Sequence, residues 1–204
     1  MKTLVIVSRN KKKKKELKEL LNSVKIEVLS LDDIDINVPE IVEDGKTFRQ
    51  NAIKKAVTIS KIINAFVIAD DSGLEVDYLD GKPGVRSSRF ARAKATDQEN
   101  NRKLIKLMKD IPRKMRGATF VCTIALADKG ELIKCVQGTC KGRIGFESRG
   151  YKGFGYDPLF TPDGYKLTFA EMKLSFKNRI SHRARALEKA KRVIQKYQIG
   201  RAHV

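Results

Sequence analysis

Apolar residues in the first third of the chain form short runs separated by stretches of helical spacing. The runs at 2–7, 25–29 and 65–68 are short and apolar enough for buried strands. Between them, apolar residues recur at helical spacing over 17–24 and over 47–63, where a Thr-x-x-Gln capping box opens the segment. The order strand, helix, strand, helix, strand indicates an α/β domain with a mixed β-sheet flanked by helices.

The hydrophobic pattern changes period in the second half of the chain. Residues 119–127 and 132–141 flank a short turn sequence, which predicts a long β-hairpin. A helix is expected over 96–108, and a last helix should end at Gly200, before a loose tail over 201–204. We expect the hairpin to extend from the sheet as a lobe, which leaves a substrate cleft between lobes.

Length and composition favour one domain over 1–204. The chain has 204 residues, and 41% of them are hydrophobic, enough for a substantial core. No apolar run approaches the roughly 20 residues of a membrane span, and the first run is too short for the core of a signal peptide. Three cysteines without a Cys-x-x-Cys pair argue against a disulfide framework or a zinc site. We therefore expect a soluble, cytoplasmic protein.

The formal net charge of +19 calls for anionic partners. Nucleic acid, an anionic lipid surface and a polyphosphate substrate all fit a strongly basic chain. A compositional bias towards lysine, spread over solvated faces, would give the same count. The charge alone does not choose between these interpretations.

Two adjacent carboxylates, Asp70 and Asp71, follow the run at 65–68 where that strand is expected to end. Successive strand side chains point to opposite faces, so the two carboxylates should diverge. One could hold a metal or activate a water molecule, and the other could orient its neighbours. Ser72 and Gly73 are expected to form a turn, and a solvated turn is the alternative interpretation of the whole segment.

A basic segment lies at the predicted junction between the first strand and the first helix. Ser8, Asn10 and Lys13 would suit a phosphate there, because the positive end of a helix attracts anions. A solvated basic turn or a targeting patch is the alternative. The loop over 30–45 is acidic in an otherwise basic chain, and it could supply a metal ligand or serve as a polar connection.

A loop rich in glycine and aromatic residues occupies 150–160, and such a loop can bend tightly and stack on a flat ring. The alternative is an aromatic loop packed on the core. Lys177, His182 and Arg183 add donors near the start of the last helix. A nucleoside triphosphate with Mg²⁺ would satisfy the basic junction, the carboxylates and the aromatic loop together.

Seven blocks of the sequence span nearly the whole chain. They are Ser8–Lys13, Thr47–Ala52 with Lys55, Ala69–Val76, Pro83–Val85 with Ser87 and Arg89, Gly153–Pro158, Thr168–Met172 and Lys177–Ala184. In these blocks and in their order, the chain resembles the inosine triphosphate pyrophosphatase family, whose bacterial members are called XTP/dITP diphosphatases.

The resemblance implies an enzyme that hydrolyses noncanonical purine nucleoside triphosphates (dITP, ITP, XTP) between the α- and β-phosphates. The products would be the nucleoside monophosphate and pyrophosphate, and the reaction would clear these nucleotides from the pool. The resemblance further implies a homodimer, with Asp71 as the general base, Asp70 in support, and Glu43 and Asp71 as Mg²⁺ ligands. The implied substrate-binding residues are Ser8, Arg9, Asn10, Lys11, Lys12, Lys13, Lys55, Ser72, Phe154, Gly155, Tyr156, Asp157, Lys177, His182 and Arg183.

Two questions stay open at this level. Many relatives carry adjacent acids where Val42 precedes Glu43 here, so the metal ligand is either Glu43 or Glu40. The main alternative function is a basic nucleic-acid-binding protein without turnover, although the sequence contains no recognised nucleic-acid module. A nearer alternative is a pyrophosphatase that acts on pyrimidine or modified bases.

Overall fold

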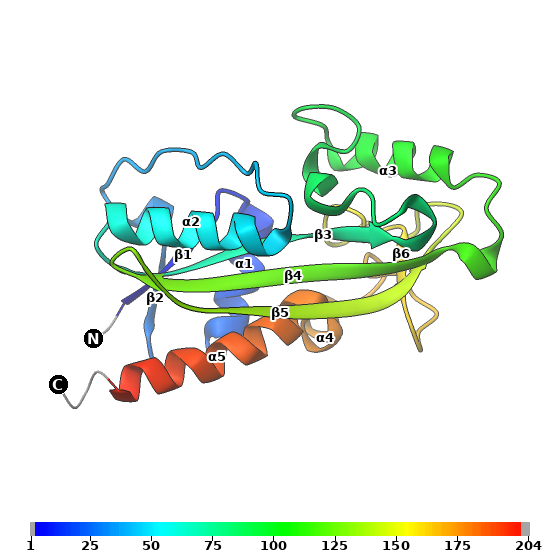
Figure 1. Ribbon diagram of the computed structural model, residues 1–204. Helices are drawn as coiled ribbons and strands as arrows, with labels where there is room; N and C mark the ends of the chain where they lie inside the picture. Colours follow the sequence, from blue (N-terminus) through cyan, green and yellow to red (C-terminus); the bar gives the residue numbers. More distant parts are fainter. Residues whose placement is uncertain (1–2, 201–204) are drawn as a thin grey trace. The chain divides into compact units, whose positions relative to one another are not determined.

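The computed structural model describes residues 3–200 (Figure 1). Its strands are β1 (Thr3–Val7), β2 (Glu27–Ser30), β3 (Phe66–Val76), β4 (Gly117–Asp128), β5 (Glu131–Ile144) and β6 (Phe160–Pro162). Its α-helices are α1 (Lys11–Leu21), α2 (Phe48–Ile62), α3 (Asp97–Leu107), α4 (Leu174–Ile180) and α5 (His182–Gly200). These elements confirm the predicted α/β class.

The strands pair in the order β2-β1-β3-β4-β5-β6. Strand β1 is parallel to both β2 and β3, whereas β5 and β6 are antiparallel, so the predicted mixed sheet is confirmed. The chain forms two compact units, and β3, β4 and β5 each contribute residues to both. The first unit contains the residues up to Asp71, Cys122–Gly138 and those from Arg183 onward, and the second contains Ser72–Val121 and Thr139–His182.

In the first unit, helices cover both faces of the strands. Figure 1 shows α2 on one side and α5 on the other. Residues such as Val67 and Ala69 of β3 pack in the apolar cluster that contains Ala52 and Ile59 of α2. The alternating residue Ile68 packs in a separate cluster with residues of α1 and α5. Strand alternation thus sorts the apolar residues between two cores.

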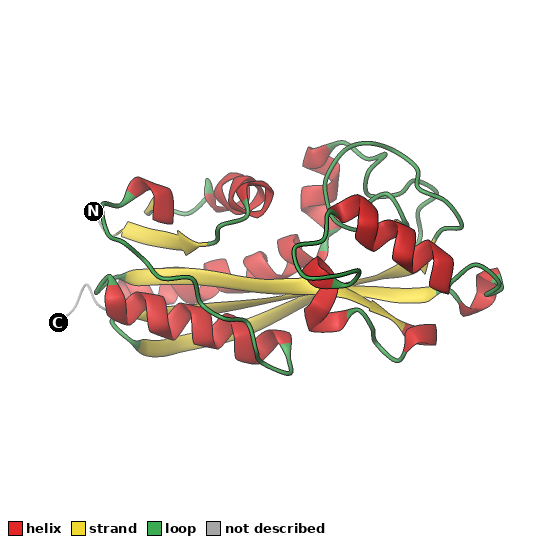
Figure 2. Ribbon diagram, turned by 90° about the horizontal axis from the view of Figure 1, so that it is seen from above, coloured by secondary structure: helices red, strands yellow, loops and turns green. Residues whose placement is uncertain are grey.

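The predicted hairpin is present, and its strands are among the longest in Figures 1 and 2. Lys129 and Gly130 connect β4 to β5, and both have positive φ angles, 53° and 90°. Two consecutive positive φ angles define the turn type whose twist suits a two-residue hairpin. Glycine adopts this conformation without steric cost, which explains its place in the turn.

The second unit has a core of its own. Leu74 and Val76 of β3 and Phe120 of β4 pack in one cluster with Leu104 and Met108, at the end of α3. Helix α3 lies within the predicted range 96–108, and a capping box opens it, with Thr96 Oγ1 accepting the backbone N–H of Glu99. Within residues 3–200, no helix combines the length and apolar character needed to cross a membrane.

The expected strand end and turn near Asp70 are wrong. Strand β3 continues through Ser72 and Gly73 to Val76. Leu74 and Val76 are fully buried, so apolar burial extends the strand past its polar centre. Ser181 is extended between α4 and α5, so the last helix begins at His182. The tail predicted over 201–204 lies outside the described residues.

Candidate functional site

The adjacent carboxylates of β3 diverge, as strand alternation predicts. Asp70 lies on the same face of the strand as Ile68 and binds cations from α1 and α5. Asp71 lies on the same face of the strand as Val67 and Ala69 and binds side chains of α2. One step along the strand therefore gives the two aspartates different environments.

Asp70 lies in a buried cluster of charges. Its Oδ2 is 3.2 Å from Lys13 Nζ and 3.3 Å from Arg183 Nη2. Arg183 also pairs with Glu16 of α1, and both of these side chains are almost fully buried. Burial alone would raise the pKa of Asp70, but Lys13 and Arg183 hold it well below its ordinary value. Asp70 is therefore ionised at neutral pH and pairs with two of the predicted substrate-binding cations.

Asp71 occupies a different polar cluster. Its Oδ2 accepts a hydrogen bond of 3.0 Å from Asn51 Nδ2, and its Oδ1 is 3.8 Å from Lys55 Nζ. Burial raises the pKa of Asp71, and the positive charges of Lys55 and Lys13 only partly offset this rise. A buried carboxylate with a raised pKa is a stronger base than an exposed one, as a general base requires.

Lys55 links Asp71 to the acidic loop. Its Nζ donates to Glu43 Oε1 at 2.8 Å and to the backbone oxygen of Asp70 at 2.7 Å. Burial would lower the pKa of Lys55, but Asp71 and then Glu43 raise it overall, so the lysine stays charged. Glu40, the alternative metal ligand, is exposed.

The two carboxylates near Lys55 provide the oxygen ligands that Mg²⁺ prefers, in the number that it commonly uses. Asp71 and Glu43 both approach Lys55 Nζ, at 3.8 and 2.8 Å. Over residues 3–200, no group of three or more His, Cys, Asp or Glu side chains could hold a metal ion. Mg²⁺ is commonly bound by only one or two carboxylates together with substrate phosphates. The pair Asp71 and Glu43 is compatible with that mode.

The basic junction uses its polar side chains to cap α1. Asn10 Oδ1 accepts the backbone N–H groups of Lys12 and Lys13, at 3.0 and 3.1 Å. Ser8 Oγ accepts the N–H of Asn10, and Arg9 donates to the backbone oxygen of Val38. The backbone amides of Lys12 and Lys13 are therefore occupied by the cap. Lys11 and Lys12 are exposed, whereas Lys13 turns towards Asp70.

The aromatic loop of the second unit is organised by Asp157. Asp157 Oδ2 accepts the N–H of Phe154 at 2.9 Å and a charged hydrogen bond from Lys177 Nζ at 2.6 Å. The ammonium of Lys177 lies 5.0 Å from the centre of the Phe154 ring, within reach of a cation–π interaction. Lys177 and Asp157 are buried, and Phe154 is half-buried. Three of the predicted substrate-binding residues therefore form one cluster.

The remaining predicted residues of the second unit are held by packing. Tyr156 is buried, and its hydroxyl donates to the backbone oxygen of Ser87 at 2.8 Å. His182 stacks on Phe120, with ring centroids 4.6 Å apart and planes 8° from parallel. Ser72 is half-buried on β3. A hydrogen bond thus orients the Tyr156 ring, and stacking orients the His182 ring.

The structure adds site residues that the sequence interpretation missed. Glu16 pairs with Arg183, and Asp97 and Asn101 both bind the backbone of Gly155. Asn101 has the helical spacing of buried Leu104, so a polar residue on the apolar face of α3 was a usable signal. No comparable local signal marks Glu16, because its partner is distant in the sequence.

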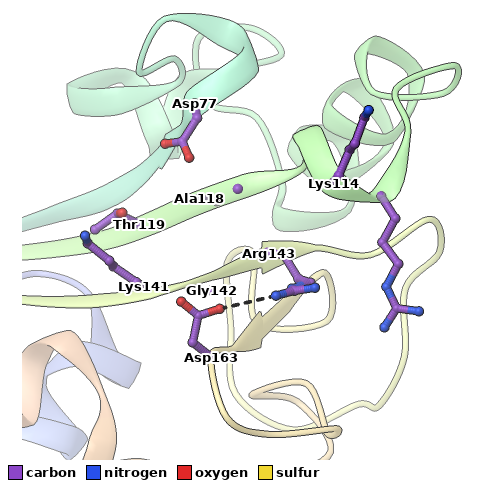
Figure 3. A pocket seen from close by; sticks show the side chains of 10 residues that line it. Asp77, Lys114, Ala118, Thr119, Lys141, Gly142, Arg143 and Asp163 are labelled. Carbon is purple, nitrogen blue, oxygen red and sulfur yellow. Dashed lines mark ion pairs between the residues drawn. The ribbon is translucent and has the colours of Figure 1, made fainter.

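A separate cavity of about 400 Å³ in the second unit contains none of the predicted site residues (Figure 3). Its lining mixes positive and negative side chains, and Arg143 and Asp163 approach each other at 3.7 Å. The charged side chains of the lining are Asp77, Arg113, Lys114, Lys141, Arg143 and Asp163. Part of the positive charge of the chain is therefore exposed at this cavity.

Comparison with known proteins gives one consistent result. The sequence model that describes the Ham1 family matches residues 4–193 of this chain. The chain is 45% identical to the dITP/XTP pyrophosphatase of Oceanobacillus iheyensis over 188 residues, which cover 92% of this chain and 95% of that protein. It is 46% identical to the dITP/XTP pyrophosphatase of Clostridium tetani over 201 residues, or 97% and 98% of the two chains.

A solved structure supports the same relationship. The HAM1 protein from Coxiella burnetii superposes with a TM-score of 0.86 at 38% identity, and the match covers 96% of this chain and all of that one. Sequence and structural similarity thus extend over nearly the entire length. The family expected from the sequence motifs is confirmed, and the chain belongs to the Ham1 family.

Proposed function

We propose that this protein hydrolyses dITP, ITP and XTP to the nucleoside monophosphate and pyrophosphate, and so removes noncanonical purine nucleotides from the nucleotide pool. The observation that carries the proposal is the near full-length similarity to proteins named dITP/XTP pyrophosphatases. The cluster of buried Asp71 and Lys55 with half-buried Glu43 supports it, because it combines a base with charges that suit a phosphate substrate.

Asp71 is proposed to accept the proton of the attacking water. Its raised pKa makes it a better proton acceptor, and Asn51 fixes the orientation of its carboxylate. Lys13 and Lys55 offset the negative charge that otherwise repels a nucleophile from the phosphates. Further contacts to the triphosphate would come from Ser8, from residues 9–12 and from Ser72.

Mg²⁺ is the proposed cofactor, held by Glu43 and Asp71. When bound, it would supply positive charge to the phosphate oxygens and to the pyrophosphate that leaves. Lys55 contacts both proposed ligands and orients Glu43 by a direct hydrogen bond. This arrangement favours Glu43 over Glu40, which is exposed.

The aromatic loop is proposed to bind the purine. Phe154 offers a ring face, and Gly155, Tyr156 and Asp157 complete the loop, with Lys177 held against it. Lys177, His182 and Arg183 would complete the contacts to the phosphates and the base, and a set of donors that reads the 6-oxo group would accept hypoxanthine or xanthine. A 6-amino group presents donors to donors, so adenine is disfavoured.

The test is pyrophosphate release in the presence of Mg²⁺, with dITP, ITP and XTP compared with dATP and dGTP. We expect rapid release from the first three nucleotides and slow release from the last two, with the monophosphate as the other product. Release of inorganic phosphate and a diphosphate would contradict the proposed bond cleavage. No release from any nucleotide by the folded protein with Mg²⁺ would overturn the function and direct attention to nucleic-acid binding.

The family resemblance also leads us to propose a homodimer in the cytoplasm. Light scattering measures the assembly directly, and a monomeric mass would contradict it. The cysteines Cys122, Cys135 and Cys140 all lie in the described part of the chain and are in no disulfide there. That state is consistent with a reducing compartment.

A further inference from the structure

Gly155 of the aromatic loop is held by helix α3 on both of its backbone polar groups. Asp97 Oδ2 accepts its N–H at 2.8 Å, and Asn101 Nδ2 donates to its C=O at 3.0 Å. Asp97 and Asn101 are four residues apart in a helix, so their side chains project from one face, one turn apart. One face of α3 therefore holds both backbone polar groups of Gly155, which belong to the two peptide units on either side of its Cα atom.

The conformation of Gly155 explains why such a grip is needed. Its φ angle is +61°, in the left-handed region that glycine adopts without steric cost. Glycine is also the residue with the most backbone freedom, so the loop gains little rigidity from its own covalent structure. Hydrogen bonds to both the N–H and the C=O replace that missing rigidity.

Asn101 is well suited to this task because it is only 7% exposed. The carbonyl oxygen of Gly155 can pair only with the amide nitrogen of Asn101, which fixes the orientation of the side-chain amide. The other amide atom, Oδ1, is buried and makes no hydrogen bond with the described residues. Among the described residues, the Asn101 side chain therefore makes its hydrogen bond to Gly155 and leaves its own buried Oδ1 without a partner.

Each neighbour of Gly155 has a different anchor. Phe154 N–H is held by Asp157, and the Tyr156 hydroxyl donates to Ser87. The Asp157 N–H also donates to the Phe154 backbone oxygen at 3.2 Å, which closes a turn over 154–157. Within this turn, Asp97 and Asn101 hold the N–H and the C=O of Gly155 directly. The direction of the Phe154 ring depends on the backbone on both sides of it, and so on Gly155.

We propose that Asp97 and Asn101 are positioning residues that set the geometry of the loop for the purine. This inference rests on the proposed function, in which the loop binds the base, and adds to it the element that shapes the loop. Neither side chain needs to touch the nucleotide. Their effect passes through Gly155 to the adjacent Phe154, and so it should appear in substrate binding rather than in the chemical step.

The kinetic test compares four variants with the wild-type protein, with dITP as substrate. Asp97→Ala and Asn101→Leu each remove one hydrogen bond to Gly155, and we expect KM to rise roughly three- to tenfold while kcat changes less than about twofold. Asp97→Asn keeps a side-chain oxygen that can accept the Gly155 N–H, and it should retain a KM near that of the wild type.

Asn100→Leu is the matched control on the same helix. Asn100 is also buried, and its side chain accepts from Ala91 N–H and donates to the Ser88 backbone oxygen, so it holds a different loop. This variant should lower the unfolding temperature without raising KM. An equal rise of KM in Asn100→Leu would show that any loosening of α3 impairs binding, and it would overturn the specific role of Asp97 and Asn101.

Hydrogen exchange of the Gly155 amide gives a second measurement that needs no nucleotide. In protein labelled with ¹⁵N-glycine, the Gly155 signal is the one that a Gly155→Ala variant lacks. We expect slow exchange in the wild type and in Asp97→Asn, and faster exchange in Asp97→Ala. Fast exchange in the wild type, or unchanged KM in both Asp97→Ala and Asn101→Leu, would overturn the proposal.

The two measurements also separate this proposal from the proposed function. If the wild type hydrolyses none of the nucleotides, the function fails, and with it a positioning role for a purine, whatever the exchange rate of Gly155. If the wild type is active and the variants bind dITP normally, the function stands and the positioning role alone fails.

Discussion

Replacing Asp70 with asparagine should destabilise the protein more than the same replacement at Asp71. Asp70 is nearly inaccessible to solvent and faces two cations, Lys13 at 3.2 Å and Arg183 at 3.3 Å. The neutral amide cannot balance them. Arg183 retains Glu16, but Lys13 loses the carboxylate that draws it inward.

The size of the effect follows from the burial of the cluster. Removing one partner of a buried ion pair costs roughly 3–5 kcal/mol of unfolding free energy. Because Arg183 retains Glu16, we expect the lower end of this range, about 3 kcal/mol. For a chain of this size, 1 kcal/mol corresponds to roughly 2–4 °C in Tm, so the expected decrease is roughly 6–12 °C.

The dependence on pH has a defined sign. The pKa of Asp70 in the folded state lies well below its ordinary value, so the ionised form stabilises the fold. This stability is fully present above the pKa of the unfolded state, about 4, and is lost as the pH falls through the folded-state pKa. The difference between wild type and Asp70→Asn should therefore be complete at neutral pH and shrink in acid.

Thermal and urea unfolding followed by circular dichroism would measure the effect, with Asp71→Asn as the matched control. In that control, Lys55 retains Glu43 and the Asp70 backbone oxygen, and Asn51 can still donate to the new amide oxygen. Burial disfavours the ionised form of Asp71, so its loss should leave stability unchanged or higher. An Asp70→Asn protein as stable as the wild type at neutral pH would refute this reasoning, as would a larger loss in Asp71→Asn.

Two further predictions concern turnover. Asp71→Asn should lower kcat for dITP by at least about 100-fold in a folded protein, as steady-state kinetics with Mg²⁺ would reveal. Wild-type kcat in this variant would remove Asp71 from the mechanism. Chelation with EDTA should abolish pyrophosphate release, and added Mg²⁺ should restore it. The Glu43→Gln variant should require more Mg²⁺ than the wild type, and Glu40→Gln should require the same amount. Full activity in EDTA, or the reverse order of the two variants, would contradict the proposed ligands.

Local interactions explain why most elements could be predicted from the sequence. The Thr47 and Thr96 capping boxes mark the starts of α2 and α3, and each box needs only residues within one helical turn. The hairpin turn at Lys129 and Gly130 is likewise set by its own two residues. Elements specified by neighbouring residues are therefore visible in a single sequence.

The course of β3 depends on distant partners and could not be predicted in the same way. Aspartate, serine and glycine favour turns, so the polar centre of β3 resembles a strand end. Its carboxylates are accommodated in the strand because Lys13 and Arg183 neutralise Asp70 and Lys55 compensates Asp71. These cations come from three helices, and only the folded structure brings them to one strand.

The register of β3 determines which aspartate serves which role. Strand β1 pairs with it in parallel, with Val5 opposite Val67 and Val7 opposite Ala69. A shift by one residue would exchange the faces of all β3 side chains, and it would place Asp70 towards α2 and Asp71 towards Arg183. The apolar residues before the aspartates oppose such a shift, because Ile68 packs in one core and Val67 and Ala69 in the other. Burial of ordinary apolar side chains thus selects the carboxylate that is kept ionised by cations and the one whose raised pKa suits a base.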